Sequence, residues 1–297
     1  YPPASTLKPF VALAGLERGV TRSESKTFCP GWYKLPGHEH RYRCWKTHGH
    51  GIVGLKQSLA QSCDVYFYDL ANSLGIDQMH GFLDIFGFGR RTGIDVPSES
   101  QGLSPSREWK REAKNQVWYP GETLISGIGQ GFNQTTPVQL AQATAMLAMR
   151  GVYMKPRVVK ASRNHNADEL TLVSSETGES LPVVNKKHWE SVIDSMVEVT
   201  KGPRGTARAL GKKLPFDVAG KTGTAQVFGI KQNQKYDVEM LEKKLQDHAL
   251  FIGFAPADNP EFVVVVVAEN GGSGSKVAAP MARKMIEQYF GLVASAL

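Results

Sequence analysis

The spacing of hydrophobic and polar residues changes along the chain, from helical periods in the first two thirds to strand-like runs near the end. Apolar residues from Phe10 to Leu16 recur at helical spacing and stop near Gly19. The stretch Thr136–Gln139 is a strong helix start, because threonine caps, proline fits the first helical position and glutamine completes a capping box. We predict helices over residues 5–18, 65–74, 77–86, 136–149, 189–200 and 280–290.

Runs rich in β-branched and aromatic residues predict strands over residues 152–161, 170–173, 216–228, 250–255 and 262–268. The last run is almost entirely valine, which is typical of a strand buried on both faces. Residues 90–122 are polar and contain several prolines, so we predict a loop there. Residues 20–57 mix glycine, proline and histidine with large aromatics, which indicates an ordered loop region rather than a linker. The order of elements predicts an α/β (α+β) protein in which helices pack on a sheet, with a mostly helical region beside it.

The composition is that of an ordinary globular protein. The 297 residues carry a net charge of +7, but lysine and arginine are spread along the chain and form no block. This balance allows an acidic partner or a nearby membrane surface without requiring either, and we expect no nucleic-acid partner. Because no run of about 18 apolar residues occurs, we predict no membrane span within these residues, and no signal peptide is visible.

Candidate chemistry begins at Ser5-Thr6-Leu7-Lys8, where the first predicted helix starts. Residues three apart share a helix face, so Lys8 would place an amine near the hydroxyl of Ser5. A lysine with a lowered pKa can take the proton of a serine and make it a nucleophile, and the helix start offers N–H groups to a developing negative charge. The alternative is a capping serine beside a solvated lysine, and this motif alone does not decide between the two.

Two later motifs could supply partners for Ser5. Ser62-Cys63-Asp64 precedes the predicted helix at 65–74, and residues two apart point together in an extended or turn segment. Lys221-Thr222-Gly223-Thr224 lies in a predicted strand, where a glycine marks close approach of another backbone or a ligand. A lysine beside two hydroxyls suits a substrate that bears a carboxylate, and an N–H group on an edge strand could stabilise an oxyanion.

Ser-x-x-Lys, Ser-x-Asp and Lys-Thr-Gly, in this order, resemble the motifs of the penicillin-recognising acyl-serine enzymes. Longer stretches resemble, more narrowly, the penicillin-binding protein 2 family, which are the monofunctional class B transpeptidases of cell elongation. These stretches are residues 1–9, 30–32, 107–110, 127–131 and 221–229, and the resemblance spans essentially all 297 residues. Asp64 departs from the asparagine of most of the superfamily, but this family commonly carries aspartate there.

The resemblance implies a penicillin-binding/β-lactamase-like transpeptidase fold, with an antiparallel sheet flanked by helices. We expect one transpeptidase domain over residues 1–297, with a helical subdomain at about 20–150 and a sheet-bearing part at about 151–297 that includes helix 5–18. A nucleophile at position 5 needs structure on both sides. We therefore expect further residues upstream of Tyr1. The resemblance implies that these include the first strands of the sheet, a pedestal domain and an inner-membrane anchor, with this domain in the periplasm.

For activity, the resemblance implies D,D-transpeptidation through an acyl-serine. Ser5 would be acylated by the D-Ala-D-Ala end of a peptidoglycan stem peptide, and an amine from a neighbouring stem peptide would then form the cross-link. Lys8 would be the base for Ser5, while Ser62 and Lys221 would relay a proton to the leaving group. The expected catalytic residues are Ser5, Lys8, Ser62, Asp64 and Lys221, and the expected substrate-binding residues are Thr222, Gly223 and Thr224.

The same resemblance implies that the threonines hold the substrate carboxylate and that the N–H groups of Ser5 and Thr224 form the oxyanion hole. β-Lactams would acylate Ser5. Expected partners are therefore stem peptides, β-lactams, and the membrane glycosyltransferase and scaffold proteins of the elongation complex. A serine β-lactamase or D,D-carboxypeptidase on the same fold would pass the acyl group to water, and an antibiotic sensor would be acylated once without turnover. Slow loss of bound penicillin distinguishes the transpeptidase from the hydrolases.

All three cysteines fall between positions 29 and 63, in the aromatic, glycine-rich region. Cysteine and histidine together favour tetrahedral Zn²⁺, so we predict a zinc site with the ligands Cys29, Cys44, His50 and Cys63. The resemblance also implies a zinc site in this region, and His50 matches that position better than His48. No Cys-x-x-Cys pair is present, and one disulfide with a free thiol, or three unrelated thiols, are the alternatives. The zinc would be structural, and the acyl transfer itself needs no cofactor.

Overall fold

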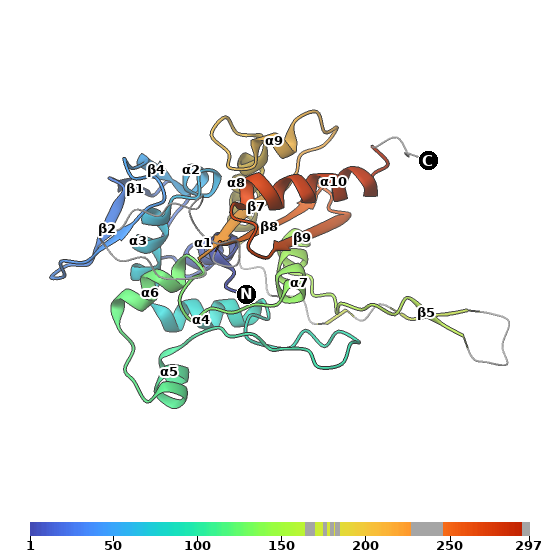
Figure 1. Ribbon diagram of the computed structural model, residues 1–297, viewed down its shortest axis with the longest axis horizontal. Coiled ribbons are helices and arrows are strands. Elements are labelled where there is room, and N and C mark those ends of the chain that lie inside the picture. Colours follow the sequence, from blue (N-terminus) through green and yellow to red (C-terminus); the bar gives the residue numbers. More distant parts are fainter. Residues whose placement is uncertain (164–169, 175–176, 179–180, 182–184, 227–245, 293–297) are drawn as a thin grey trace.

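The computed structural model describes residues 1–163, 170–174, 177–178, 181, 185–226 and 246–292. The centre of this part of the chain is an antiparallel sheet with the strand order β7 (Ala219–Ala225), β8 (His248–Ala255) and β9 (Phe262–Ala268). Helices lie on both sides of this sheet (Figure 1). The predicted mixed fold, with an antiparallel sheet flanked by helices, is confirmed.

β8 is the strand that both helical layers cover. Leu250, Ile252 and Phe254 point into the larger hydrophobic core. Ala249 and Phe251 belong to a second core on the opposite face. The larger core includes residues of α1 (Lys8–Glu17), α7 (Pro137–Ala148) and α8 (Lys186–Lys201), and the second core includes residues of α10 (Ala279–Tyr289).

The sequence pattern predicted burial on both faces for β9, and the structure shows that this prediction is wrong. The strand buried on both faces is β8. In β9 only Val264 and Val266 are buried, and their neighbours in the strand are half-buried. In β8, by contrast, every residue after His248 is buried. Among the described residues β9 is an edge strand, so its valine run reflects β propensity, whereas the central position of β8 requires full burial.

The predicted helices are confirmed, with ends shifted by a few residues. The first begins as a 3₁₀ turn, η1 (Ala4–Leu7), that continues directly into α1. The others are α3 (Asp64–Leu74), α4 (Ile76–Ile85), α7, α8 and α10. The capping box that Thr136 was expected to form is present, because its side chain accepts a hydrogen bond from the N–H of Gln139 and the Gln139 side chain accepts one from the N–H of Thr136.

The region at 20–57, which we predicted to be an ordered loop, contains two small two-stranded antiparallel sheets instead. β1 (Lys26–Cys29) pairs with β4 (Gly51–Gly54), and β2 (Trp32–Lys34) pairs with β3 (Arg41–Arg43). The strands are too short to show an alternating pattern in the sequence. The glycines and histidines around them are typical of loops, so the pattern indicated a loop. The chain then enters α2 (Leu55–Ala60), a short helix that we did not predict.

The predicted loop at 90–122 is also partly wrong, because it contains α5 (Arg107–Lys114) and the start of α6 (Pro120–Gly127). α5 has almost no hydrophobic face that a pattern could show. Ser106 caps it by accepting a hydrogen bond from the N–H of Trp109, and basic residues occupy its last turn. Its middle is held as well, because the buried Lys110 pairs with Glu122 and the Trp109 ring packs against Phe132. A search for hydrophobic periodicity detects neither the caps nor these contacts.

The predicted strands at 152–161 and 170–173 are much shorter in the structure. They form a pair of two-residue antiparallel strands, β5 (Ala161–Ser162) and β6 (Thr171–Leu172), that projects away from the sheet (Figure 1). β7 is shorter than the predicted strand 216–228, whose last two residues lie outside the described part. α9 (Arg208–Gly211) and the π-helix η4 (Gly274–Ala278) complete the fold. None of the described helices combines the length and the hydropathy that crossing a membrane would require.

Candidate active site

The 3₁₀ turn that carries Ser5 places Ser5 one turn before Lys8, on the same side of the helix. In a 3₁₀ helix residues three apart lie one above the other, and the N–H of Lys8 donates a hydrogen bond to the carbonyl of Ser5. Ser5 is half-buried while Lys8 is fully buried beneath it. Ala4 has a left-handed φ of 49°, and its N–H donates to the carbonyl of Gly129 at 2.8 Å. The residue before the candidate nucleophile is therefore held in an unusual conformation by a contact from outside its own turn.

The ammonium group of Lys8 is directed at the Ser-x-Asp motif. Its Nζ donates to the Ser62 carbonyl at 3.0 Å, to the Ser62 hydroxyl at 3.2 Å and to Asp64 Oδ1 at 2.7 Å. These contacts occupy the three N–H donors of a charged lysine. The hydroxyl of Ser5 makes no hydrogen bond to another residue in the described part of the chain. In this state the lysine is thus paired with Asp64 and not with Ser5.

Ser62 receives hydrogen bonds from two lysines. Lys221 Nζ donates to its hydroxyl oxygen at 2.9 Å, in addition to the bond from Lys8. A hydroxyl has two lone pairs and one proton, so two donors saturate the oxygen and leave the proton free to point elsewhere. Ser62 itself adopts a left-handed φ of 55°, which is uncommon for a residue other than glycine. The arrangement leaves the Ser62 hydroxyl able to donate its proton to another group, beside the amino groups of two lysines.

Lys221 reaches Ser62 from the buried side of β7. It is fully buried, and burial together with the nearby charge of Lys8 holds its pKa well below the usual lysine value. Thr222 and Thr224 alternate to the other face of the strand, where Thr224 is exposed. A lysine whose pKa is lowered gives up its proton more readily, which suits a proton relay through Ser62.

Glycines let the backbones around the site approach one another closely. A Cβ on Gly223 would lie 2.9 Å from Thr6 Cγ2 and 3.3 Å from the carbonyl of Pro3, so the predicted close approach at this glycine is that of the Ser5 turn. A Cβ on Gly129 would lie 2.1 Å from the carbonyl oxygen of Ala4. The side chain of Gln130 donates to the carbonyl of Thr224 at 3.3 Å. The loop after α6 therefore lies against both the Ser5 turn and β7.

Asp64 connects the lysines to the hairpin region. Its Oδ1 accepts from Lys8, and its Oδ2 accepts from the backbone N–H of Trp45 at 2.9 Å. The indole N–H of Trp45 in turn donates to the carbonyls of Gln61 and Ser62. Burial raises the pKa of Asp64, and the charge of Lys8 partly offsets that rise. One carboxylate faces two lysines in this network, so the site retains an excess of positive character that favours an anionic substrate.

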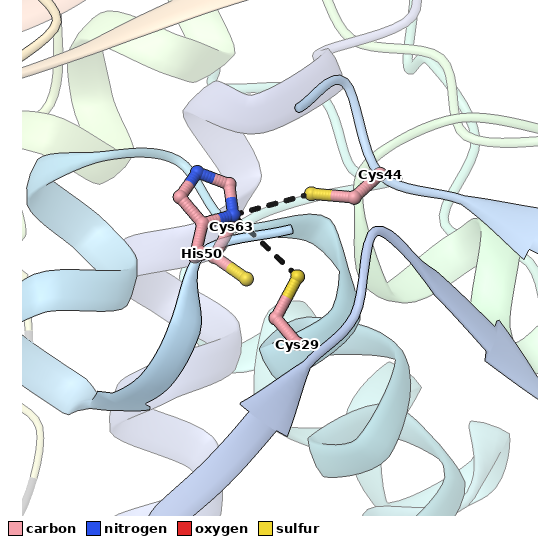
Figure 2. A group of neighbouring side chains, drawn as sticks. All are labelled: Cys29, Cys44, His50 and Cys63. Atoms are coloured by element: carbon pink, nitrogen blue, oxygen red, sulfur yellow. Dashed lines mark hydrogen bonds between the residues drawn. The ribbon is translucent and has the colours of Figure 1, made fainter. Parts of the chain in front are cut away.

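The cysteine cluster lies directly behind this network. The ligand atoms of Cys29, Cys44, His50 and Cys63 all lie within 4.8 Å of one another (Figure 2). His50 Nδ1 is 3.5 Å from the sulfurs of both Cys29 and Cys44, and no disulfide joins any of the three cysteines. A hydrogen bond from Cys63 lowers the pKa of Cys44, to about 3, which favours a thiolate. Cys63 also directly precedes α3, so the cluster includes one residue of the segment that presents Ser62 and Asp64.

Comparison with known proteins agrees with this geometry. The family described as the penicillin binding protein transpeptidase domain matches residues 1–287. The chain belongs to this family. It is similar to the peptidoglycan D,D-transpeptidase MrdA of Acinetobacter baumannii, with 43% identity over 284 residues that cover 95% of this chain and 42% of the relative. It is also 40% identical to MrdA of Escherichia coli K12 over 283 residues, covering 95% of this chain and 44% of the relative.

Solved structures show the same fold. Pseudomonas aeruginosa PBP2 in complex with WCK 5153 superposes with a TM-score of 0.85 at 46% identity, covering 97% of this chain and 58% of that one. Helicobacter pylori PBP2 in its complex with MreC gives a TM-score of 0.80 at 29% identity, covering 99% of this chain and 50% of that one. The chain spans less than half the length of these two MrdA relatives. The resemblance to the penicillin-binding protein 2 family found in the sequence is thus confirmed.

The structure brings the residues of the three motifs together, and it adds others that the sequence did not single out. Trp45 is one of several aromatics at 20–57, and no signal in the sequence links it to Asp64. The glycines at 127–131 invite interpretation as a phosphate-binding loop, but the structure gives them a packing role beside the Ser5 turn. Gln130 lies in that same glycine-rich stretch. The glycines around it suggest a close approach of backbones, but nothing in the sequence places Gln130 beside Thr224.

The close contact at Gly129 makes a testable prediction. In Gly129→Ala the new methyl group would push against the Ala4 carbonyl, so the Ser5 turn must move. We expect acylation by a β-lactam to slow by roughly 10-fold or more, as for other misplaced catalytic groups. Rates of labelling by a fluorescent penicillin measure this.

Gly19→Ala is the matched control, because Gly19 has a similar positive φ of 69° but nothing within 4 Å of its would-be Cβ. Both variants share the cost of a left-handed alanine, about 1–2 kcal/mol. Equal acylation rates in the two variants would contradict a positioning role for the Gly129 contact.

Proposed function

We propose that this domain is a peptidoglycan D,D-transpeptidase that acts through an acyl-enzyme on Ser5. The observation that carries the proposal is the sharing of the Ser62 hydroxyl by two buried lysines, next to a helix-start serine that is half-exposed. The names of the relatives, peptidoglycan D,D-transpeptidase, support the same reaction. The acceptor in this proposal is an amine of a neighbouring stem peptide, and the donor is a stem peptide that ends in D-Ala-D-Ala.

The proposed acylation uses each residue at a defined step. Ser5 Oγ attacks the carbonyl carbon of the D-Ala-D-Ala peptide bond, and its proton passes to Lys8 in the neutral form. The C–N bond breaks as the departing nitrogen takes a proton from Ser62, which Lys221 then replaces. In the second step the acceptor amine attacks the ester carbonyl and gives a proton to Ser62, which passes one back to Lys221. The C–O bond to Ser5 then breaks as Ser5 Oγ takes its proton back from Lys8. No redox change or co-reactant is needed.

Substrate binding in this proposal relies on the charge excess of the site and on β7. Thr222, Gly223 and Thr224 present hydroxyls and a bare stretch of strand to the carboxylate end of the substrate, with the Lys221 charge behind them. The N–H groups of Ser5 and Thr224 are proposed to bind the oxyanion, at a helix start and on a strand at the sheet edge respectively. β-Lactams, which carry a carboxylate and a reactive amide, would follow the same path and remain attached.

The cellular setting is part of the proposal. The structures of Helicobacter pylori PBP2 with MreC and of a peptidoglycan synthase complex support scaffold and glycosyltransferase partners of the elongation machinery. A substrate in the cell wall would require this domain to lie in the periplasm, held there by an anchor in the inner membrane.

The cysteine cluster is proposed to hold a structural Zn²⁺. A tetrahedral zinc with ordinary Zn–S and Zn–N bonds places sulfur and nitrogen roughly 3.5 Å apart, and both sulfur-to-His50 distances are 3.5 Å. Three cysteines and one histidine would fill the coordination shell, leaving no position for a catalytic water. The zinc would stabilise the segment at Ser62–Asp64, because Cys63 lies within it.

The first prediction from this proposal concerns the nucleophile. Ser5→Ala should abolish covalent labelling by a fluorescent penicillin while the circular dichroism spectrum and melting temperature stay close to wild type. Peptide mapping of the labelled wild type should find the adduct on Ser5 and should find it still attached after many minutes. Labelling that survives in Ser5→Ala would refute the assignment, and rapid loss of the label would favour a β-lactamase or carboxypeptidase.

The second concerns the metal. Protein purified without chelator should contain about one equivalent of zinc by elemental analysis, and chelation should lower both the melting temperature and the rate of penicillin acylation. His50→Ala should lose the zinc, whereas His48→Ala, which changes an exposed histidine two positions away, should retain it. Less than about a tenth of an equivalent in the wild type, or a native disulfide between two of the cysteines, would end this proposal.

A further inference from the structure

A hydroxyl outside the three motifs contacts the substrate-binding strand. Thr206 lies in the loop between α8 and α9, and its Oγ1 is 2.8 Å from Oγ1 of Thr222. Only a few per cent of the surface of Thr222 is exposed, while Thr206 is half-buried at the edge of the site. The pair therefore lies at the boundary between the buried strand and solvent.

The loop fixes the position of Thr206 from three sides. The N–H of Thr206 donates to the carbonyl of Ala60 at 3.1 Å, at the end of α2 just before Ser62. The N–H of Ala207 donates to the carbonyl of Val199 at 2.9 Å. A Cβ on Gly205 would lie 2.3 Å from that same carbonyl, so the loop packs directly on the last turn of α8. Thr206 is thus held in place by the backbone on both sides of it.

The number of protons on the two hydroxyls limits what they can do together. Each threonine hydroxyl has one proton and two lone pairs. If Thr206 donates to Thr222, the single proton of Thr222 is released from any contact within the protein and can go to a substrate carboxylate. A hydrogen bond received from Thr206 also polarises the Thr222 hydroxyl, which strengthens the bond that it donates.

We propose that Thr206 is a positioning residue for carboxylate recognition, which orients the Thr222 hydroxyl so that its proton faces the terminal carboxylate of the substrate. This inference rests on the proposed function, because it assumes that Thr222 binds that carboxylate. The loop between α8 and α9 would then be part of a site that is otherwise built from the Ser5 turn, the Ser62 segment and β7. It also gives the site a determinant of specificity for acidic over neutral ends of a substrate.

The test compares two probes on the full-length gene product. Benzylpenicillin has a free carboxylate and its methyl ester does not, so the ratio of their second-order acylation rates reports carboxylate recognition. Thr206→Val should slow acylation by the acid about 3- to 10-fold, the range for one hydrogen bond, and should change the rate for the ester little. Thr206→Ser, which keeps the hydroxyl, should restore the wild-type ratio.

A double-mutant cycle then asks whether Thr206 acts through Thr222. On a Thr222→Val background, the added Thr206→Val change should have almost no further effect on the rate for the acid. Thr200→Val is the structural control. Thr200 is buried and its hydroxyl donates to the Val218 carbonyl, so its loss should lower the melting temperature without changing the acid-to-ester ratio.

Three results would overturn the inference: an unchanged acid rate in Thr206→Val, an equal loss for acid and ester, or the same loss on the Thr222→Val background. These outcomes differ from failure of the proposed function. If the domain were not an acyl-serine enzyme, the wild type would react with neither probe, or Ser5→Ala would still be labelled. With Ser5 labelling intact, the acid-to-ester ratio tests Thr206 alone.

Discussion

The site depends on a single oxygen atom, the hydroxyl of Ser62, which accepts hydrogen bonds from the amino groups of two buried lysines. Lys8 comes from the turn that carries Ser5, and Lys221 comes from β7, so this oxygen joins three segments far apart in the sequence. Burying two lysines against one carboxylate is unfavourable unless every donor finds a partner. Lys8 has Asp64 and two oxygens of Ser62 as partners, and Lys221 has the Ser62 hydroxyl and the carbonyl of Thr222.

The fold around this oxygen holds the three segments together with little freedom. β8 is buried on both faces and fixes β7 beside it, while the Ser5 turn packs on Gly223 and is held from the other side by Gly129. The left-handed conformations of Ala4 and Ser62 show that the surrounding contacts override local backbone preference at both serines. Cys63, within the segment that presents Ser62 and Asp64, also belongs to the cysteine cluster. Such rigidity suits catalysis by positioned hydrogen bonds, because little reorganisation is then needed during the reaction.

Much of the site could be predicted from the sequence because its residues occur in short motifs with fixed local geometry. Ser5 and Lys8 share a helical turn, and the glycine at 223 indicates close approach in any strand. The helices with a hydrophobic face, such as α3 and α8, could be predicted for a similar reason. The cysteine cluster was also predictable, because all the cysteines of the chain fall in one region.

The rest could not be predicted, because it depends on contacts between distant segments or on elements without a hydrophobic pattern. α5 is held by its cap and by contacts of Lys110 and Trp109 with distant side chains, and the strands at 26–54 are too short to show alternation. Nothing in the sequence around Trp45, Gln130 or Thr206 indicates that they lie beside Asp64, Thr224 or Thr222. Burial on both faces was assigned to the valines of β9 because composition shows β propensity but does not show which strand is central.

The central claim, that the hydroxyl of Ser62 delivers the proton to the leaving group, is tested most directly by changing the leaving group. A β-lactam or peptide releases an amine that must be protonated, whereas a thioester substrate releases a thiolate that needs no proton. Acylation rates of Ser62→Ala with both substrates are therefore the decisive measurement. We expect the rate with penicillin to fall by about 10²-fold or more, the usual scale for loss of a general acid, and the rate with the thioester to fall by less than about 10-fold. An equal loss with both substrates would contradict the account and would leave Ser62 with only a structural role.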